Sequence, residues 1–328
     1  PVALPGANVT AEIATRRLVL PNDLELTDLA GSARLHRGSL KADLAANLET
    51  GKVRATTALR ADGRNDASYT FGLDVDALPI GNVLRRLNGG KPAQITGSFD
   101  TDISLAGNGR TADDLLESTT GTVRLRGTGG ILRALEPQDE ILALGTAGLG
   151  RLLGGAIDRP GIKALGDLVT AFSAIHYDTL VLDARRDEKG LVTVETARLD
   201  SPELLLAGNG KIGPLLIADP GAAPLDIPLR FGAKGNLAWA MDVLDLLSGE
   251  RNDRGYRMAK EPLHLAGTLG SPDTSEFWKL VAATAKRVVN LSEEDLRRER
   301  GGQLPERPAG DDPGKEIINR GLEILRGL

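Results

Sequence analysis

The chain has 328 residues with 40 basic and 45 acidic side chains, a formal net charge of −5 at pH 7 that argues against nucleic acid as a partner. Its hydrophobic content of 41% is enough to bury a core, so a chain that is disordered throughout is excluded. It contains no cysteine, which excludes disulfides and cysteine-ligated metals, and its three histidines lie far apart in the sequence, which argues against a histidine-based metal site.

The first part of the chain is dominated by apolar residues at every second position. The clearest segments are 40–48, 53–60, 69–76 and 95–105. Because successive side chains of a strand point to opposite faces, each segment predicts a strand with one apolar and one polar face, as is typical of antiparallel sheets. The polar connections 50–52 and 61–66 are of hairpin length, so we expect an antiparallel meander over residues 8–77.

The rest of the chain alternates further strands with a few helices. Strands are expected near 122–128, 174–185, 191–199, 203–212, 225–236 and 262–269. Helices are expected at 79–87, from Thr111 onward, and at 138–153, 161–173, 238–248 and 274–291. Thr111 and Asp114 have the spacing of a capping box, in which each residue caps the other. The predicted fold class is therefore mainly β with α additions, with the helices clustered after residue 78.

This pattern divides the chain into four parts. We expect an antiparallel β meander at 1–110, a β region with helical insertions at 111–291, a polar linker at 292–314 and a terminal amphipathic helix at 315–328. The terminal helix is short enough to be marginal alone, and docking on the body, contact with a membrane surface and fraying all remain open. No uninterrupted apolar run reaches the ~18 residues of a membrane-spanning helix. We expect the chain, which opens at Pro1 inside a strand-like segment, to be a piece whose anchor lies upstream.

Two glycine-rich segments invite a nucleotide-binding interpretation. Residues 107–112 read Gly-Asn-Gly-Arg-Thr-Ala, follow a predicted strand and fit the dinucleotide fingerprint, and residues 208–213 fit the same pattern. The strand before the first copy alternates, however, whereas a central parallel strand is apolar throughout, and the second copy runs into Pro214. We interpret both as glycine bulges or tight turns at strand ends. A nucleotide-dependent enzyme remains the least favoured function.

Other chemistry-bearing residues have simpler interpretations. The acidic pair 113–114 and the acidic run 293–295 lie at expected helix starts, where negative charge complements the helix dipole. We favour this interpretation over metal-binding or acid–base sites. His176 and His264 lie in predicted strands and are expected to be solvated or hydrogen-bonded. We therefore expect no catalytic residues, no metal and no cofactor, and a protein that is not an enzyme.

Two stretches resemble a known family. The first runs from strand 98–105 through Gly107-Asn108-Gly109, Leu115-Leu116 and Gly121 to strand 123–127, and the second is Pro262-Leu263-His264-Leu265-Ala266-Gly267-Thr268-Leu269-Gly270-Ser271-Pro272. Over about residues 95–275 the chain resembles the C-terminal region of AsmA-like envelope proteins. The resemblance implies a repeating β-groove: a long curved antiparallel sheet, shaped as a half-pipe, with a few helices covering it. It also implies a periplasmic body anchored in the inner membrane and a role in holding or moving phospholipids for outer-membrane biogenesis. The chain departs from the family in lacking an N-terminal anchor helix.

The apolar strand faces are the candidate site. An aliphatic face left uncovered by protein marks a lipid or partner site, and leucine, valine and alanine suit acyl chains held by buried area. The expected lining residues are Leu40, Leu44, Leu48, Val53, Leu59, Tyr69, Phe71, Leu73, Phe99, Ile103 and Leu105. The expected partners are phospholipid, the inner membrane through the upstream anchor, and other envelope proteins. The alternative is a self-covered β scaffold or interaction domain whose apolar faces close on one another without lipid.

Overall fold

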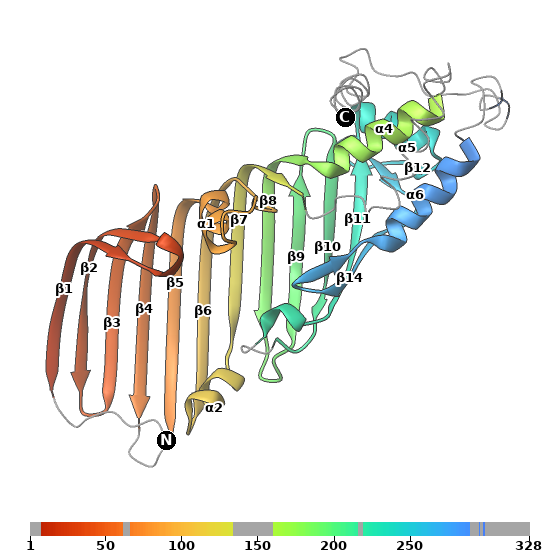
Figure 1. Ribbon diagram of the computed structural model, residues 1–328. Coiled ribbons are helices and arrows are strands. Elements are labelled where there is room, and N and C mark those ends of the chain that lie inside the picture. The colour runs from red at the N-terminus through yellow and green to blue at the C-terminus, as the bar shows by residue number, and fades with distance from the viewer. Residues whose placement is uncertain are drawn as a thin grey trace.

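The protein is one long, open, curved antiparallel sheet with its three longest helices gathered at one end, as the computed structural model shows (Figure 1). The structure describes residues 8–61, 66–133, 160–215 and 219–288, together with 295 and 298. The expected fold class, mainly β with a long curved antiparallel sheet, is confirmed.

Fifteen strands make up the sheet, and the first eleven are neighbours in chain order. The first half holds β1 (Val9–Val19), β2 (Glu25–His36), β3 (Ser39–Leu48), β4 (Gly51–Ala61), β5 (Ala67–Pro79), β6 (Ser98–Gly109) and β7 (Thr120–Leu132). The second half holds β8 (Ile175–Arg186), β9 (Val192–Asp200), β10 (Leu204–Ile212), β11 (Leu225–Ala233), β12 (Leu247–Arg251), β13 (Arg257–Ala259), β14 (Leu263–Thr268) and β15 (Ser271–Asp273). The path runs on from β11 through β13 to β12, while β14 pairs with β11 and β15.

Five α-helices and two short 3₁₀ turns lie in the described residues. They are η1 (Pro21–Asp23), α1 (Ile80–Leu87), α2 (Ala112–Glu117), α4 (Pro160–Ser173), η2 (Pro220–Ala222), α5 (Gly235–Val243) and α6 (Ser275–Val288). The helices predicted at 79–87 and 161–173 are confirmed as α1 and α4. The capping box of α2 is also confirmed, because the Thr111 hydroxyl accepts the Asp114 N–H at 3.1 Å and the Asp114 carboxylate accepts the Thr111 N–H at 3.0 Å.

Other boundaries differ from the prediction. The strand expected at 225–236 ends at Ala233, since Gly235 takes a positive φ of 58° and starts α5. The helix expected at 238–248 is wrong beyond Val243, because the chain turns at Asp245 with φ 60° and Leu247 begins β12. The helix expected at 138–153, most of the linker at 292–314 and the terminal helix at 315–328 lie outside the described residues. β6 and β7 pair across the predicted boundary between 110 and 111, and the division of the chain into domains stays a prediction.

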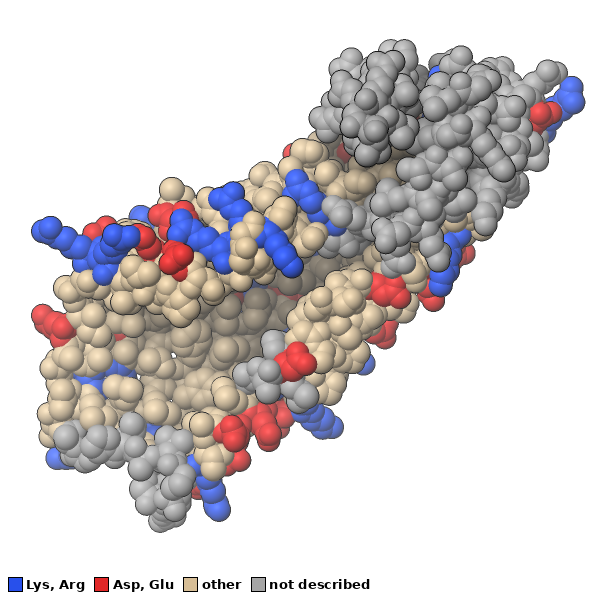
Figure 2. Space-filling view, in the orientation of Figure 1, with Lys and Arg blue, Asp and Glu red and all other residues tan. Residues whose placement is uncertain are grey.

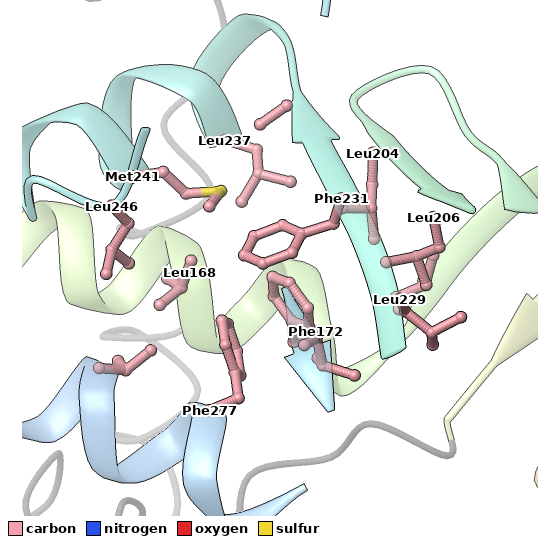
Figure 3. Close-up of a cluster of buried hydrophobic side chains, with 14 of the residues drawn as sticks. Leu168, Phe172, Leu204, Leu206, Leu229, Phe231, Leu237, Met241, Leu246 and Phe277 are labelled. Atoms are coloured by element: carbon pink, nitrogen blue, oxygen red, sulfur yellow. The ribbon is translucent and has the colours of Figure 1, made fainter. Parts of the chain in front are cut away.

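The main hydrophobic core lies at the C-terminal end of the sheet. There α4, α5 and α6 cover one face of β9, β10, β11 and β14 with fully buried side chains such as Leu168 and Leu237 (Figure 3). Phe172 of α4 sits at the centre, with its ring centroid 5.1 Å from Phe277 of α6 and 6.5 Å from Phe231 of β11. Large aromatic rings fill the wedge between helices and sheet, so this end of the molecule is closed by its own side chains.

An ion-pair network connects the end of β9 to the loop between β12 and β13. The Asp200 carboxylate accepts hydrogen bonds from Arg198 at 2.7 and 2.8 Å and from Arg254 at 2.8 Å. The hydrogen bonds from Arg198 are the main reason that the pKa of Asp200 lies below its ordinary value, and Arg254 adds to the effect. Charge-assisted, two-pronged contacts of this kind are the strong members of their class.

Asp200 predicts a specific pH dependence. A carboxyl group whose pKa is lowered in the folded state stabilises the fold above its unfolded pKa, and this contribution is lost as the pH falls through the folded value. We expect Asp200→Asn to be less stable than the parent chain by about 1 kcal/mol at pH 7. The difference should shrink as the pH falls below the ordinary value of 3.8, because protonated aspartate and asparagine are then alike. Unfolding midpoints of the two chains measured from pH 3 to pH 7 test this, and a constant difference across that range would contradict it.

Candidate functional site

The eleven predicted lining residues lie on one face of the sheet, termed here the apolar face. In-register pairing aligns side chains from β3, β4, β5 and β6 into rows across the strands. The rows are Leu40, Leu59, Tyr69 and Gly107; Ala42, Thr57, Phe71 and Leu105; Leu44, Ala55, Leu73 and Ile103; and Ala46, Val53, Val75 and Thr101. β7 extends two of these rows with Val123 and Leu125. The apolar face is therefore continuous from β3 to β7.

Part of this face is left open by the described residues. The predicted residues that remain partly exposed and belong to neither buried cluster are Leu40, Leu44, Leu59, Tyr69, Phe71, Ile103 and Leu105. Figure 2 shows this side of the molecule as a hollow lined mainly by uncharged residues, with most of the charged side chains along its borders. The N-terminal half of the apolar face is thus a groove, in contrast to the helix-covered C-terminal end.

Four predicted residues are packed against protein. Phe99 is only 3% exposed and belongs to the main core, so it does not line an open surface. Leu48, Val53 and Leu73 pack against a small cluster termed here the rim cluster, formed by buried side chains of β5 and α1 and of the residue that follows η1. The members of the rim cluster are Leu24, Val75, Leu78 and Val83. The rim cluster narrows the groove along the edge where α1 lies.

The sequence analysis missed two residues of the apolar face because of strand irregularities. The β5–β6 register shifts between Val75 and Leu78, so these residues share a face although they are three positions apart. Ala77 takes a positive φ of 51° at this bulge and donates its N–H to the Asp100 carboxylate at 2.8 Å. A similar shift in β2, at Asp28 with φ 51°, places Leu26 opposite Leu48. Alanine and aspartate carry no reliable bulge signal, so strict alternation assigns Leu26 and Leu78 to the wrong face.

The edge of the groove next to α1 is held by one arginine. The Arg86 guanidinium pairs with Glu49 at 3.1 Å and donates to the backbone carbonyl of Asp23. Asp23, Glu49 and Arg86 belong to the β1–β2, β3–β4 and β5–β6 connections respectively. Tying these three connections together draws the ends of the first strands toward one another and supports the curvature of the sheet.

At the opposite edge of the groove, α2 packs against two glycines of β6. A Cβ on Gly107 would lie 2.6 Å from the Leu115 carbonyl oxygen, and one on Gly109 would lie 2.4 Å from the Asp114 Cβ. The bulge or turn expected at Gly107 is wrong, because pairing with β5 continues in register through Gly109, and the missing side chains instead let α2 pack on the strand. The second glycine motif does contain a bulge, between Gly208 and Gly210.

The other face of the sheet, termed here the polar face, is charged. Its cross-strand pairs include Lys52 with Asp76 and Arg54 with Asp74, and Arg126 forms an ion pair with Asp183 at 2.8 Å. Two hollows of about 620 and 450 Å³ lie mainly among these and neighbouring polar side chains. We interpret them as gaps between long side chains over a solvated surface, because most of their lining residues are charged or polar and the rest are mainly alanine.

Chemical features elsewhere in the described residues are few. No group of three or more His, Asp or Glu side chains there could hold a metal ion. His264 pairs with Asp226 at 2.9 Å, as expected for a hydrogen-bonded sheet residue, and His176 is exposed. Among the helices that the structure describes, none combines the length and apolar character needed to cross a membrane.

Comparison with known proteins adds no relative. No family model, no curated protein and no solved structure matches the chain.

Proposed function

We propose that this chain is a non-enzymatic module that binds phospholipid acyl chains along the apolar face of β3–β7. Its role in this proposal is to hold or conduct phospholipid between membranes of a cell envelope in support of outer-membrane biogenesis. The chain would do so as a periplasmic body whose inner-membrane anchor lies upstream.

The observation that carries the proposal is the contrast between two parts of one face. From β9 onward the apolar face is covered by α4, α5 and α6, whereas from β3 to β7 the described residues cover the strip at the rim cluster, the surroundings of Phe99 and the end of β6 under α2, and leave the rows between them partly exposed. A contiguous aliphatic surface in water is costly, at about 25 cal/mol per Å² of apolar area. We therefore expect a ligand or partner to cover this area and remove it from water.

The chemistry of the open part favours acyl chains. Its large, partly exposed side chains are leucine, isoleucine, phenylalanine and tyrosine, set among alanines and two threonines, and the hydroxyl of Tyr69 is already hydrogen-bonded to Thr119. Such a surface offers contact area and no array of donors or acceptors that would fix a polar ligand. Charged groups such as Arg86 and Glu49 lie at the borders, where a lipid headgroup would remain in water.

The location in the cell envelope rests on the AsmA-like sequence motifs alone. The groove-like sheet agrees with the architecture that those motifs imply, and the absence of any matching relative leaves the family assignment as part of the proposal.

A self-covered scaffold is the second candidate. It is favoured by the tightly packed C-terminal end and by the rim cluster, which show that parts of this chain can cover the apolar face. In that case the open rows would meet another protein surface and carry no lipid.

Lipid extraction separates the two candidates. We expect the chain, purified without detergent and extracted with organic solvent, to release phospholipid in an amount comparable to the protein, as measured by mass spectrometry with internal standards. The stripped chain should then take up a fluorescent phospholipid saturably. A chain that carries no lipid and takes up none would contradict the proposal and favour the scaffold.

A further inference from the structure

Among the strands that the structure describes, β1 is an open edge of the sheet. In the described residues it pairs only with β2, and its outer backbone groups have no strand beside them. Four of its apolar side chains are notably exposed: Val9 at 51%, Ile13 at 37%, Leu18 at 40% and Val19 at 55%. A long edge strand with exposed apolar side chains is a template for pairing with another strand.

The other free edges of the sheet have features that discourage pairing. β12 is five residues long and contains Gly249, Glu250 and Arg251, and β15 is three residues long with Pro272 at its centre. Short length, charge and proline are the usual means by which proteins protect strand edges. β1 also carries charge, at Glu12, Arg16 and Arg17, but it has eleven residues and neither glycine nor proline, so its length and its lack of proline distinguish it from the other edges.

The sequence of β1 is complementary to itself in the antiparallel direction. With Ala14 placed opposite Ala14 of a second copy, residues 12–16 pair and Glu12 falls opposite Arg16 twice, once on each side of the two-fold axis. The pairing is confined to this central segment, because Thr10 lies on the polar face whereas Leu18, opposite Leu26, lies on the apolar face. Glu12 lies on the polar face, opposite Ser32 of β2, and Arg16 lies on the same side of β1 four residues later. Both side chains are exposed, and neither takes part in an ion pair within the described part of the chain. Arg17, in contrast, is already paired with Glu25.

We infer that β1 pairs antiparallel with β1 of a second copy of this chain, with Ala14 on the two-fold axis. Opposite charges directly across two strands stabilise the pairing, and like charges there destabilise it. A two-fold axis perpendicular to the sheet keeps the two apolar faces on the same side, so the grooves of both copies would form one continuous surface. The inference stands on the edge itself and does not require lipid in the groove.

Exchanging the charges at positions 12 and 16 tests whether the partner is a second copy of this chain. We expect the 328-residue chain to have a mass of twice 34.6 kDa by light scattering after size-exclusion chromatography. Glu12→Arg and Arg16→Glu should each weaken the dimer about tenfold, since each places like charges opposite one another twice. The double variant E12R/R16E should restore dimerisation to within about threefold of the parent, because the opposite charges are re-formed with their positions exchanged.

Cysteine cross-linking tests the register. The chain has no cysteine, so Ala14→Cys introduces a single thiol that the two-fold axis brings next to its own copy. Thr10→Cys is the matched control on the same strand and face, because Thr10 of the two copies would be eight positions apart, roughly 27 Å. A disulfide needs Cα atoms within about 7 Å, so A14C should oxidise to a covalent dimer while T10C stays uncross-linked.

The two experiments have outcomes that overturn the inference. A chain that stays monomeric at about 100 μM would exclude the pairing as a stable state. A dimer that both single variants leave intact, and in which T10C cross-links as fast as A14C, would place the contact on another surface. A chain that is monomeric alone but binds an unrelated extended peptide at this edge would identify a different partner and likewise refute pairing with a second copy. None of these results alters the expectation for lipid extraction.

Discussion

Replacing Phe172 with alanine is expected to lower the free energy of unfolding by about 3–5 kcal/mol. Phe172 is 0% exposed, and its ring contacts Phe277 and Trp278 at centroid distances of 5.1 and 5.8 Å. Removing the ring leaves a cavity at the junction of α4, α6 and the sheet, which this packed surrounding fills only in part. Urea unfolding followed by circular dichroism and by tryptophan fluorescence measures the change.

Phe71→Ala is the matched control for this prediction. It removes the same atoms from the apolar face of β5, where the side chain is partly exposed and lies outside both buried clusters. Phe71 buries less apolar area than Phe172. In the lipid-free chain, Phe71→Ala should therefore lower the free energy of unfolding by less than about half as much as Phe172→Ala does. Equal costs would show that the groove is covered in solution, which would remove the basis of the proposed function.

The strands were predictable from the sequence because each carries its own signal. Alternation in 40–48, 53–60 and 69–76 reports which side chains face a core, and the short polar connections leave antiparallel hairpins as the simplest linkage. The predicted lining residues share one face for the same reason, since hairpin-linked strands pair side by side and align their apolar positions. The capping box at Thr111 is equally local and was predicted correctly.

Features that depend on contacts between distant residues were not predictable. Local alternation cannot reveal the bulge at Ala77, whose N–H is satisfied by Asp100 on the neighbouring strand. The same holds for Gly107, which is needed because α2 packs on the strand from outside it. The difference in burial between Phe99 and Phe71 also depends on distant contacts. Both residues fit the alternation of their strands, yet only Phe99 lies in the main core. Which strand residues are buried depends on the part of the sheet against which helices such as α4 pack. An amphipathic pattern predicts a helix but does not specify this position.

A carboxylate placed in the groove is expected to abolish lipid loading without unfolding the chain. Leu105 lies on the apolar face of β6, partly exposed, between Phe71 of β5 and Gly121 of β7. In Leu105→Glu, an acyl chain occupying the groove would have to desolvate an unpaired charge, at a cost above the ~1.4 kcal/mol that corresponds to a tenfold loss of affinity. Retained phospholipid per chain should therefore fall at least tenfold by mass spectrometry.

Ser104→Glu provides the control on the same strand. Ser104 is the neighbouring residue, exposed on the polar face opposite Gly72, so the added charge there meets water. We expect Ser104→Glu to retain lipid at the level of the parent chain and to unfold near the parent's midpoint, because an exposed substitution away from packed groups changes stability little. Circular dichroism checks that Leu105→Glu is folded under the conditions of the lipid assay. Loss of lipid in both variants would indicate a general effect of negative charge on binding. Retention in both would show that lipid, if present, lies elsewhere on the molecule, since only the apolar face distinguishes position 105 from position 104.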